Sequence, residues 1–126
     1  MNWRALGNAG EPFPAWVRAL KNKSGVYAIR ERGWFSTTIV YVGESHTGAL
    51  YKTLTRHFQA WHRSKKFWFG QYSPAQTDPG HTYDRSTVEV TVRTSSRERA
   101  LSLQADWIAR LKPRDNHAGT VEEVPF

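Results

Sequence analysis

The sequence has 126 residues, the length of one domain, and 39% of them are hydrophobic, which is enough for one modest core and not for two. It carries 18 Lys and Arg against 11 Asp and Glu, and the formal charge of +7 favours a polyanionic partner, nucleic acid rather than an acidic membrane surface. The absence of cysteine excludes disulfides and thiolate metal sites and fits a cytoplasmic protein, and we expect no spanning segment, signal peptide, lipid anchor or other membrane association.

The first 24 residues predict a helical extension. Pro14 stands at the first turn of a short apolar segment, Ala15 to Leu20, and Phe13, Trp16 and Val17 fall on one face of that helix together with Leu20. We expect this helix to pack on a sheet.

Two β-rich runs follow, Val26 to Ile29 and Ile39 to Val42, and Glu31 to Trp34 between them supplies turn chemistry. The pattern predicts a hairpin that brings Tyr27 and Tyr41 onto neighbouring strands. A glycine flanks each tyrosine run, Gly25 before the first and Gly43 after the second. A glycine there lets another backbone or a ligand phosphate approach closely.

The next segment has the spacing of an amphipathic helix. Its apolar side carries Leu50, Leu54, His57, Phe58 and Trp61, and its polar side carries Lys52, Arg56, Gln59 and Arg63. The polar side is suited to an anion. His57 has two interpretations: a general base beside Arg56, or a hydrogen-bonded histidine of the core.

Residues 64 to 85 have no sustained periodicity and predict a loop or insertion. Within it, Lys65, Lys66 and Trp68 interleave cations with aromatic rings, a combination that binds phosphates and stacks unpaired bases. The same run is also typical of an ordinary loop that is anchored in a small core.

Strict alternation from Thr87 to Arg93 predicts a half-buried strand with Val88, Val90 and Val92 on one side. A helix follows, with Ser95 and Glu98 as a capping box and Pro113 at its end. Gln104 falls in the apolar stripe of this helix, so it is either a satisfied core amide or a group that faces a functional cavity. We expect residues 117–126 to form a tail, which is acidic from Thr120 to Phe126.

Together these elements predict one domain over residues 1–126, of α/β (α+β) class, with a core at about 25–116. The expected architecture is a small, three-stranded, mainly antiparallel sheet flanked by helices.

Four segments, in this order, resemble the GIY-YIG nuclease superfamily. They are Gly25-Val26-Tyr27, Tyr41-Val42-Gly43, Leu54-Thr55-Arg56, and the last helix with its Lys112-Pro113-Arg114-Asp115-Asn116 ending. The match covers about Gly25 to Asn116. It implies a metal-dependent endonuclease that hydrolyses phosphodiester bonds of DNA with Mg²⁺ or Mn²⁺.

The resemblance also implies roles for individual residues. Tyr41, helped by Tyr27, orients or deprotonates the attacking water, Arg56 neutralises the phosphate, and Asn116 holds the site together by hydrogen bonds. His57 is a further catalytic candidate, and Lys52, Arg63, Lys65, Lys66 and Trp68 are the candidates for nucleic-acid binding. A tyrosine with a pKa near 10 is a poor base unless a cation lowers that pKa.

The chain departs from the family's pattern at two positions. Gln104 stands where the family has its metal-binding glutamate, and an amide lacks the charge with which a single protein ligand holds Mg²⁺. Glu44 stands where relatives often have lysine, and it is a candidate replacement ligand. The chain is therefore a metal-dependent endonuclease or an inactive Glu-to-Gln form of one, natural or engineered; the alternative is a non-catalytic nucleic-acid-binding module on the same fold.

The sequence leaves the partner open in several respects. DNA is the expected partner, single- or double-stranded, with RNA as an alternative, and a homodimer is one way to cut two strands. A basic protein-interaction domain is a third and weaker hypothesis, because a fold does not determine a function.

Overall fold

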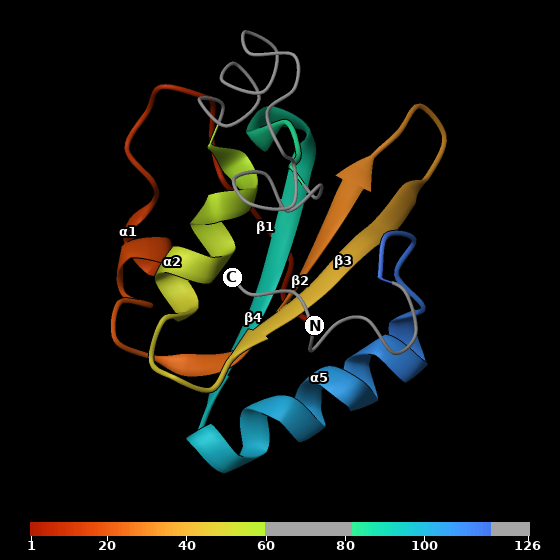
Figure 1. The fold of residues 1–126 in the computed structure, drawn as a ribbon. Helices are drawn as coiled ribbons and strands as arrows, with labels where there is room; N and C mark the ends of the chain where they lie inside the picture. Colours follow the sequence, from red (N-terminus) through yellow and green to blue (C-terminus); the bar gives the residue numbers. More distant parts are fainter. Residues whose placement is uncertain (60–81, 117–126) are drawn as a thin grey trace, which may run out of the picture.

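The computed structural model describes residues 1–59 and 82–116, and it has the mixed helix and strand composition that the sequence predicts. The elements are β1 (Arg4–Ala5), α1 (Ala15–Arg18), β2 (Ser24–Arg32), β3 (Thr37–Ser45), α2 (Leu50–Thr55), η1 (Arg56–Phe58), η2 (Arg85–Thr87), β4 (Val88–Ser95) and α5 (Arg97–Leu111). The strands form one antiparallel sheet in the order β1-β4-β2-β3 (Figure 1). The predicted fold class is confirmed, with four strands in place of three. The additional strand, β1, pairs only Arg4 and Ala5 with β4, which is too short for a pattern in the sequence.

The hairpin of β2 and β3 is longer than predicted. Glu31 and Arg32 pair with Thr38 and Thr37, so the turn predicted at Glu31 to Trp34 is wrong for its first two residues and correct for Gly33 and Trp34. The reversal lies further out, where the amide of Gly33 donates to the carbonyl of Ser36 at 2.8 Å. Pairing between the strands therefore outweighs the polar composition of this segment.

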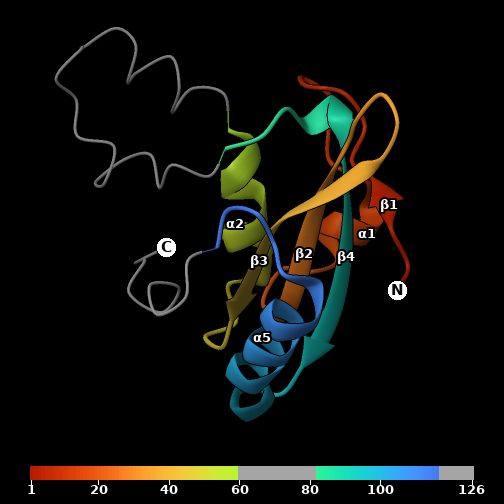
Figure 2. The same cartoon turned by 90° about the vertical axis from the view of Figure 1, so that its right-hand side faces the viewer.

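The two faces of the sheet are covered by different helices. Tyr27, Ile29 and Val90 point to the face on which α1 and α2 pack, and Val26 and Ala28 point to the face on which α5 packs. Figures 1 and 2 show α1 and α2 on one side of the sheet and α5 on the other. We call these sides the α2 face and the α5 face. The valines of β4 that were predicted to share a side, Val88, Val90 and Val92, do so on the α2 face.

The helices differ from the prediction in two details. The helix expected to run from Leu50 toward Trp61 changes to a 3₁₀ turn at Arg56, and Gln59 is already extended. The last helix begins after Ser96, whose side chain makes no capping bond, so the capping box predicted at Ser95 is wrong. The hydroxyl of Ser95 donates instead to the carbonyl of Ser96 at 2.8 Å. A local hydrogen bond of this kind competes directly with capping.

Two residues at the end of the predicted loop, Tyr83 and Arg85, are buried. Tyr83 is buried, and its amide donates to the carbonyl of His57 at 2.8 Å. Arg85 is buried as well, and its guanidinium donates to the carbonyls of Leu6, Glu11 and Pro12 at 2.7 to 3.1 Å. Residues 64–81 of that loop and the predicted tail, 117–126, lie outside the described residues. Among residues 1–59 and 82–116, no helix has both the length and the apolar character needed to cross a membrane.

Candidate functional site

A cluster of buried aromatic side chains lies between the sheet and α2. The Tyr27 hydroxyl and Nε2 of His57 are 2.7 Å apart, within hydrogen-bond distance. The ring centre of His57 lies 4.7 Å from that of Tyr41 and 6.0 Å from that of Tyr83. All four side chains are buried, and Tyr27 and His57 are completely so. The fold thus brings together Tyr27, Tyr41 and His57, three of the residues singled out in the sequence, and adds Tyr83.

Both glycines beside the tyrosine runs allow close approaches. Gly43 pairs with Tyr27 across the hairpin, and a Cβ on Gly43 would collide with the Tyr27 hydroxyl and its ring. A Cβ on Gly25 would collide with the carbonyl oxygen of Arg93 on β4. Gly25 therefore accommodates a neighbouring backbone, which is one of the two uses predicted for these glycines, the other being the approach of a ligand phosphate. Gly43 accommodates a tyrosine side chain of the protein itself.

The tyrosines of this cluster are held in the neutral form. Burial raises the pKa of Tyr27 well above 10, and the neighbouring Tyr41 and Tyr83 raise it further. Burial, followed by the carboxylate of Glu44, also raises the pKa of Tyr41. Arg56 lowers the pKa of Tyr27, but this is the smallest of the effects on it. The described residues therefore do not supply the lowered pKa that a tyrosinate base requires, and a neutral phenol acts as a hydrogen-bonding and positioning group.

Alkaline titration tests this electrostatic description. Because the folded-state pKa values of Tyr27, Tyr41 and Tyr83 lie above the ordinary value of 10.0, their contribution to stability is complete below pH 10 and is lost as the pH rises through the raised values. We expect these tyrosines to ionise later in the native protein than in urea, as measured by tyrosinate absorbance. The free energy of unfolding should fall as the pH rises above about 10. Ionisation of all five tyrosines together near pH 10 in the native state would contradict the description.

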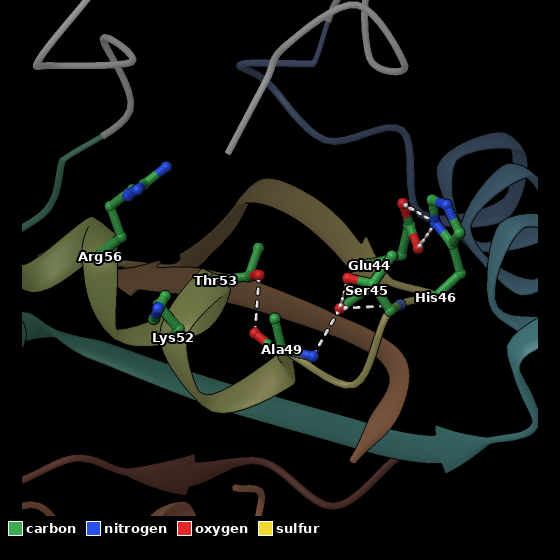
Figure 3. A pocket seen from close by; sticks show the side chains of 8 residues that line it. Glu44, Ser45, His46, Ala49, Lys52, Thr53 and Arg56 are labelled. Carbon is green, nitrogen blue, oxygen red and sulfur yellow. Dashed lines mark hydrogen bonds and ion pairs between the residues drawn. The ribbon is translucent and has the colours of Figure 1, made fainter. Parts of the chain in front are cut away.

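A pocket of about 200 Å³ opens where β3 ends and α2 begins. It is lined by Glu44, Ser45, His46, Thr47, Ala49, Lys52, Thr53 and Arg56. Figure 3 shows Lys52 and Arg56 together on one wall, one helical turn apart, and Glu44 with His46 at the other end. The carboxylate of Glu44 lies 3.1 Å from Nδ1 of His46. The predicted anion-binding side of this helix thus faces a pocket, and Lys52 and Arg56 both contribute to it.

The positive charge of the pocket comes from the side chains of Lys52 and Arg56, and the amides of the loop before α2 are bonded to hydroxyls. The hydroxyl of Ser45 accepts from the amides of Ala49, at 2.9 Å, and Thr47, at 3.4 Å. The hydroxyl of Ser24 accepts from the amide of Gly48 at 3.0 Å. These three amides precede α2, and the amide of Leu50, its first residue, donates to the carbonyl of Lys23. Lys52 and Arg56 are the cationic side chains that line the pocket and could contact an anion there.

Asn116 lies on the outer edge of β3. Its Oδ1 accepts from the amide of Val42 at 2.8 Å, and its Nδ2 donates to the carbonyl of Val42 at 2.9 Å. The preceding amides of Arg114 and Asp115 donate to the carbonyls of Ile39 and Val40. The segment after α5 therefore closes the edge of β3, and Asn116 holds two elements together by hydrogen bonds. The same segment reaches the aromatic cluster, because the Tyr83 hydroxyl donates to Asp115 at 2.8 Å.

Gln104 is buried in the middle of α5, in the stripe that packs on the α5 face of the sheet. It does not line the pocket of Lys52 and Arg56, and within residues 1–59 and 82–116 its side-chain amide makes no hydrogen bond. It therefore lies on the opposite side of the sheet from Tyr27 and His57. Glu44 pairs with Val26, whose side chain points to the α5 face, but unlike Gln104 it lines one end of the pocket.

Among residues 1–59 and 82–116, no group of side chains forms a site suited to a resident divalent cation. Mg²⁺ and Mn²⁺ require oxygen ligands with negative charge, and the described part of the chain holds no cluster of three His, Asp or Glu side chains. Glu44 supplies a carboxylate to the pocket but already interacts with His46, and Gln104 lies elsewhere. No chemical step is therefore assigned to a metal ion here.

The remaining candidates lie outside the described residues: Arg63, Lys65, Lys66 and Trp68. Sequence reasoning missed Tyr83 and Asp115 as members of the site. Tyr83 stands in a segment without periodicity, and its burial depends on contacts with His57 and Asp115 that are distant in sequence. No local signal marks such a residue.

Comparison with known proteins adds no relative: no family model, curated protein or solved structure matches the chain.

Proposed function

We propose that this chain is an endonuclease-type domain that binds the phosphodiester backbone of DNA in the pocket between β3 and α2. One observation supports this most strongly: Lys52 and Arg56 stand one turn apart on the same wall of a pocket in a chain of formal charge +7. A guanidinium offers a planar fork of donors to two phosphate oxygens, and a lysine beside it adds a point charge. Two neighbouring cations suit a phosphate better than they suit a metal ion or an apolar ligand.

The buried cluster behind the pocket would act by positioning. Tyr27 and His57 have no exposed surface, so neither contacts a ligand in this arrangement. Their hydrogen bond links β2 to η1, the turn that carries Arg56. We infer that this link keeps the guanidinium of Arg56 at the pocket, where it neutralises the phosphate.

The chain as written is proposed to bind DNA without hydrolysing it. Hydrolysis of a phosphodiester places negative charge on the phosphate oxygens and on the leaving oxygen, and nucleases of the resembled type use a divalent cation to stabilise that charge. The described residues hold no cluster of three His, Asp or Glu side chains, and Gln104, at the position of the resembled family's metal-binding glutamate, is neutral and does not line the pocket. A non-catalytic nucleic-acid-binding module on the same fold, in the cytoplasm, is the second candidate, and the neutral residue at position 104 favours it.

Cleavage assays on the chain and on Gln104→Glu distinguish the two candidates. Labelled single- and double-stranded DNA and RNA are incubated with each form in magnesium, in manganese and in EDTA, and binding is measured on the same substrates. We expect the present chain to bind in all three conditions without cutting, because phosphate contacts by Lys52 and Arg56 need no metal.

Cleavage by Gln104→Glu only in the presence of metal would support the endonuclease proposal. Binding by both forms with cleavage by neither would support the binding module. Absence of binding by either form, at low as well as physiological salt, would refute both, since phosphate contacts strengthen as salt falls. Thermal unfolding of Gln104→Glu is measured in parallel, because a carboxylate in this buried stripe costs stability unless it is paired or protonated.

A further inference from the structure

The tip of the β2–β3 hairpin exposes two adjacent aromatic rings. Trp34 is 96% exposed and Phe35 is 99% exposed, and the loop that carries them projects beyond the body of the sheet (Figure 1). The turn itself is ordered by the hydrogen bond from Gly33 to Ser36. Single exposed apolar residues are common on proteins, but two neighbouring large rings at nearly full exposure indicate a contact surface.

The base of this hairpin carries arginines and carboxylates together. Glu31 on the hairpin pairs with Arg114, which also pairs with Asp115, and Glu89 on β4 pairs with Arg30. Arg32 donates to the carbonyl of Ser86 and is paired with no carboxylate in the described part of the chain. Exposed rings beside arginine are the combination that holds unpaired nucleic-acid bases, since a base stacks on a ring while a cation contacts its phosphate.

We propose that Trp34 and Phe35 form a stacking platform for unpaired bases, so that the chain prefers single-stranded or locally opened nucleic acid. This inference rests on the proposed function and names the strand state of its ligand. It commits to nucleic acid rather than to a lipid surface, because Arg32 lies near the rings in the sequence and the whole chain has a formal charge of +7.

The distance between pocket and tip is compatible with one bound strand. The pocket lies at the Ser45 end of β3 and the tip at its Thr37 end. The 9 residues of β3, at about 3.3 Å each, span roughly 27 Å. A strand with the rise of B-form DNA covers this distance in about eight nucleotides. The exposed side chain of Arg114 lies beside this path, where its amide binds Ile39.

Equilibrium binding to three DNA probes of about 20 nucleotides tests the proposal, since this length exceeds the span from pocket to tip. The probes are a single strand, a fully paired duplex, and the same duplex with a central unpaired bubble, each measured by fluorescence anisotropy over a range of salt. The variants are Trp34→Ala with Phe35→Ala, and Trp34→Phe, which keeps a ring. Leu101→Ala, at a 45% exposed position on α5, is the control for loss of an exposed apolar side chain.

We expect the double alanine variant to bind the single strand and the bubble at least about fivefold more weakly, the minimum effect of one stacked base. Its affinity for the paired duplex should change little, and the dependence of binding on salt should stay as in the wild type, because no phosphate contact is removed. Trp34→Phe and Leu101→Ala should bind like the wild type. Thermal unfolding of the double variant should match the wild type, since rings this exposed contribute little to the core.

Equal binding of all three probes by the double variant and the wild type would refute the stacking platform and leave the proposed function intact. A wild type that binds none of the probes would refute both. Vesicles of phosphatidylserine and phosphatidylcholine serve as a fourth ligand. Loss of vesicle binding in the double variant, with DNA binding unchanged, would assign the tip to a lipid surface and overturn the proposal.

Discussion

Replacing Lys52 and Arg56 together by alanine is expected to weaken binding of DNA by at least about 30-fold at physiological salt. Arg56 is half-buried on the pocket wall, and a hydrogen bond to a charged group contributes about 1.5–3 kcal/mol, or roughly 10- to 150-fold in affinity. Lys52 is exposed and adds mainly through release of counterions from the phosphates. The measurement is equilibrium binding of a labelled oligonucleotide over a range of salt concentrations.

The salt dependence separates contact from general charge. Each lost phosphate contact should reduce the slope of log K against log salt by about 0.9 on duplex DNA and about 0.7 on a single strand. The matched control is Arg99→Ala with Arg110→Ala, which removes the same charge from exposed positions on α5. If this control weakens binding as much as the pocket variant, the pocket is not the phosphate site and only the net charge of the chain matters.

Gly43→Ala is expected to lower the free energy of unfolding by about 1–3 kcal/mol or more, the usual cost of overpacking a core. The new Cβ would occupy the space of the Tyr27 hydroxyl and ring. Tyr27 is completely buried and its hydroxyl is within hydrogen-bond distance of His57, so its ring cannot shift without displacing other side chains of the cluster. Chemical denaturation measures the loss, and the melting temperature should fall by roughly 5 to 15 °C.

Gly33→Ala is the control for Gly43→Ala. Gly33 lies in the exposed turn of the same hairpin, where a Cβ meets only the carbonyl of Ser36 at 3.0 Å, so its cost should be much smaller. A double-mutant cycle with Tyr27→Leu locates the strain, because removal of the ring should relieve much of the cost of Gly43→Ala. Additive effects of the two changes would show that Tyr27 is not what Gly43 accommodates.

Much of the fold could be predicted because its patterns are local. Alternation in β4 placed Val88, Val90 and Val92 on one side, and it did so correctly, because successive side chains of a strand point to opposite faces. The prediction that the strands carrying Tyr27 and Tyr41 pair with each other is also confirmed. The prediction is wrong where pairing between strands competes with the local preference of the residues. Glu31 and Arg32, predicted to lie in a turn, pair instead with Thr38 and Thr37.

The candidate site was predictable only in part. Lys52 and Arg56 are four residues apart, and the period of a helix alone places such residues on one side. The remaining members depend on contacts between segments distant in the sequence. Tyr83 enters the cluster from the end of a long segment without periodicity, and Asn116 reaches back to the backbone of Val42. Gln104 lies in the buried stripe that the sequence predicts. The helical period of that stripe does not indicate which face of the sheet the helix covers.

The sequence by itself determined the class of fold, the basic character of the chain, the amphipathic helix with Lys52 and Arg56, and the strands that carry the two tyrosines. These depend on composition and on periods of two and of about 3.6 residues, which the chain carries locally. Only the tertiary structure decided that Gly43 makes room for Tyr27, that His57 is a buried partner of that tyrosine, and that Gln104 lies across the sheet from both. The reason is physical: a close contact between side chains depends on the order and register of strands and on which helix covers which face, and these follow from packing of the whole chain.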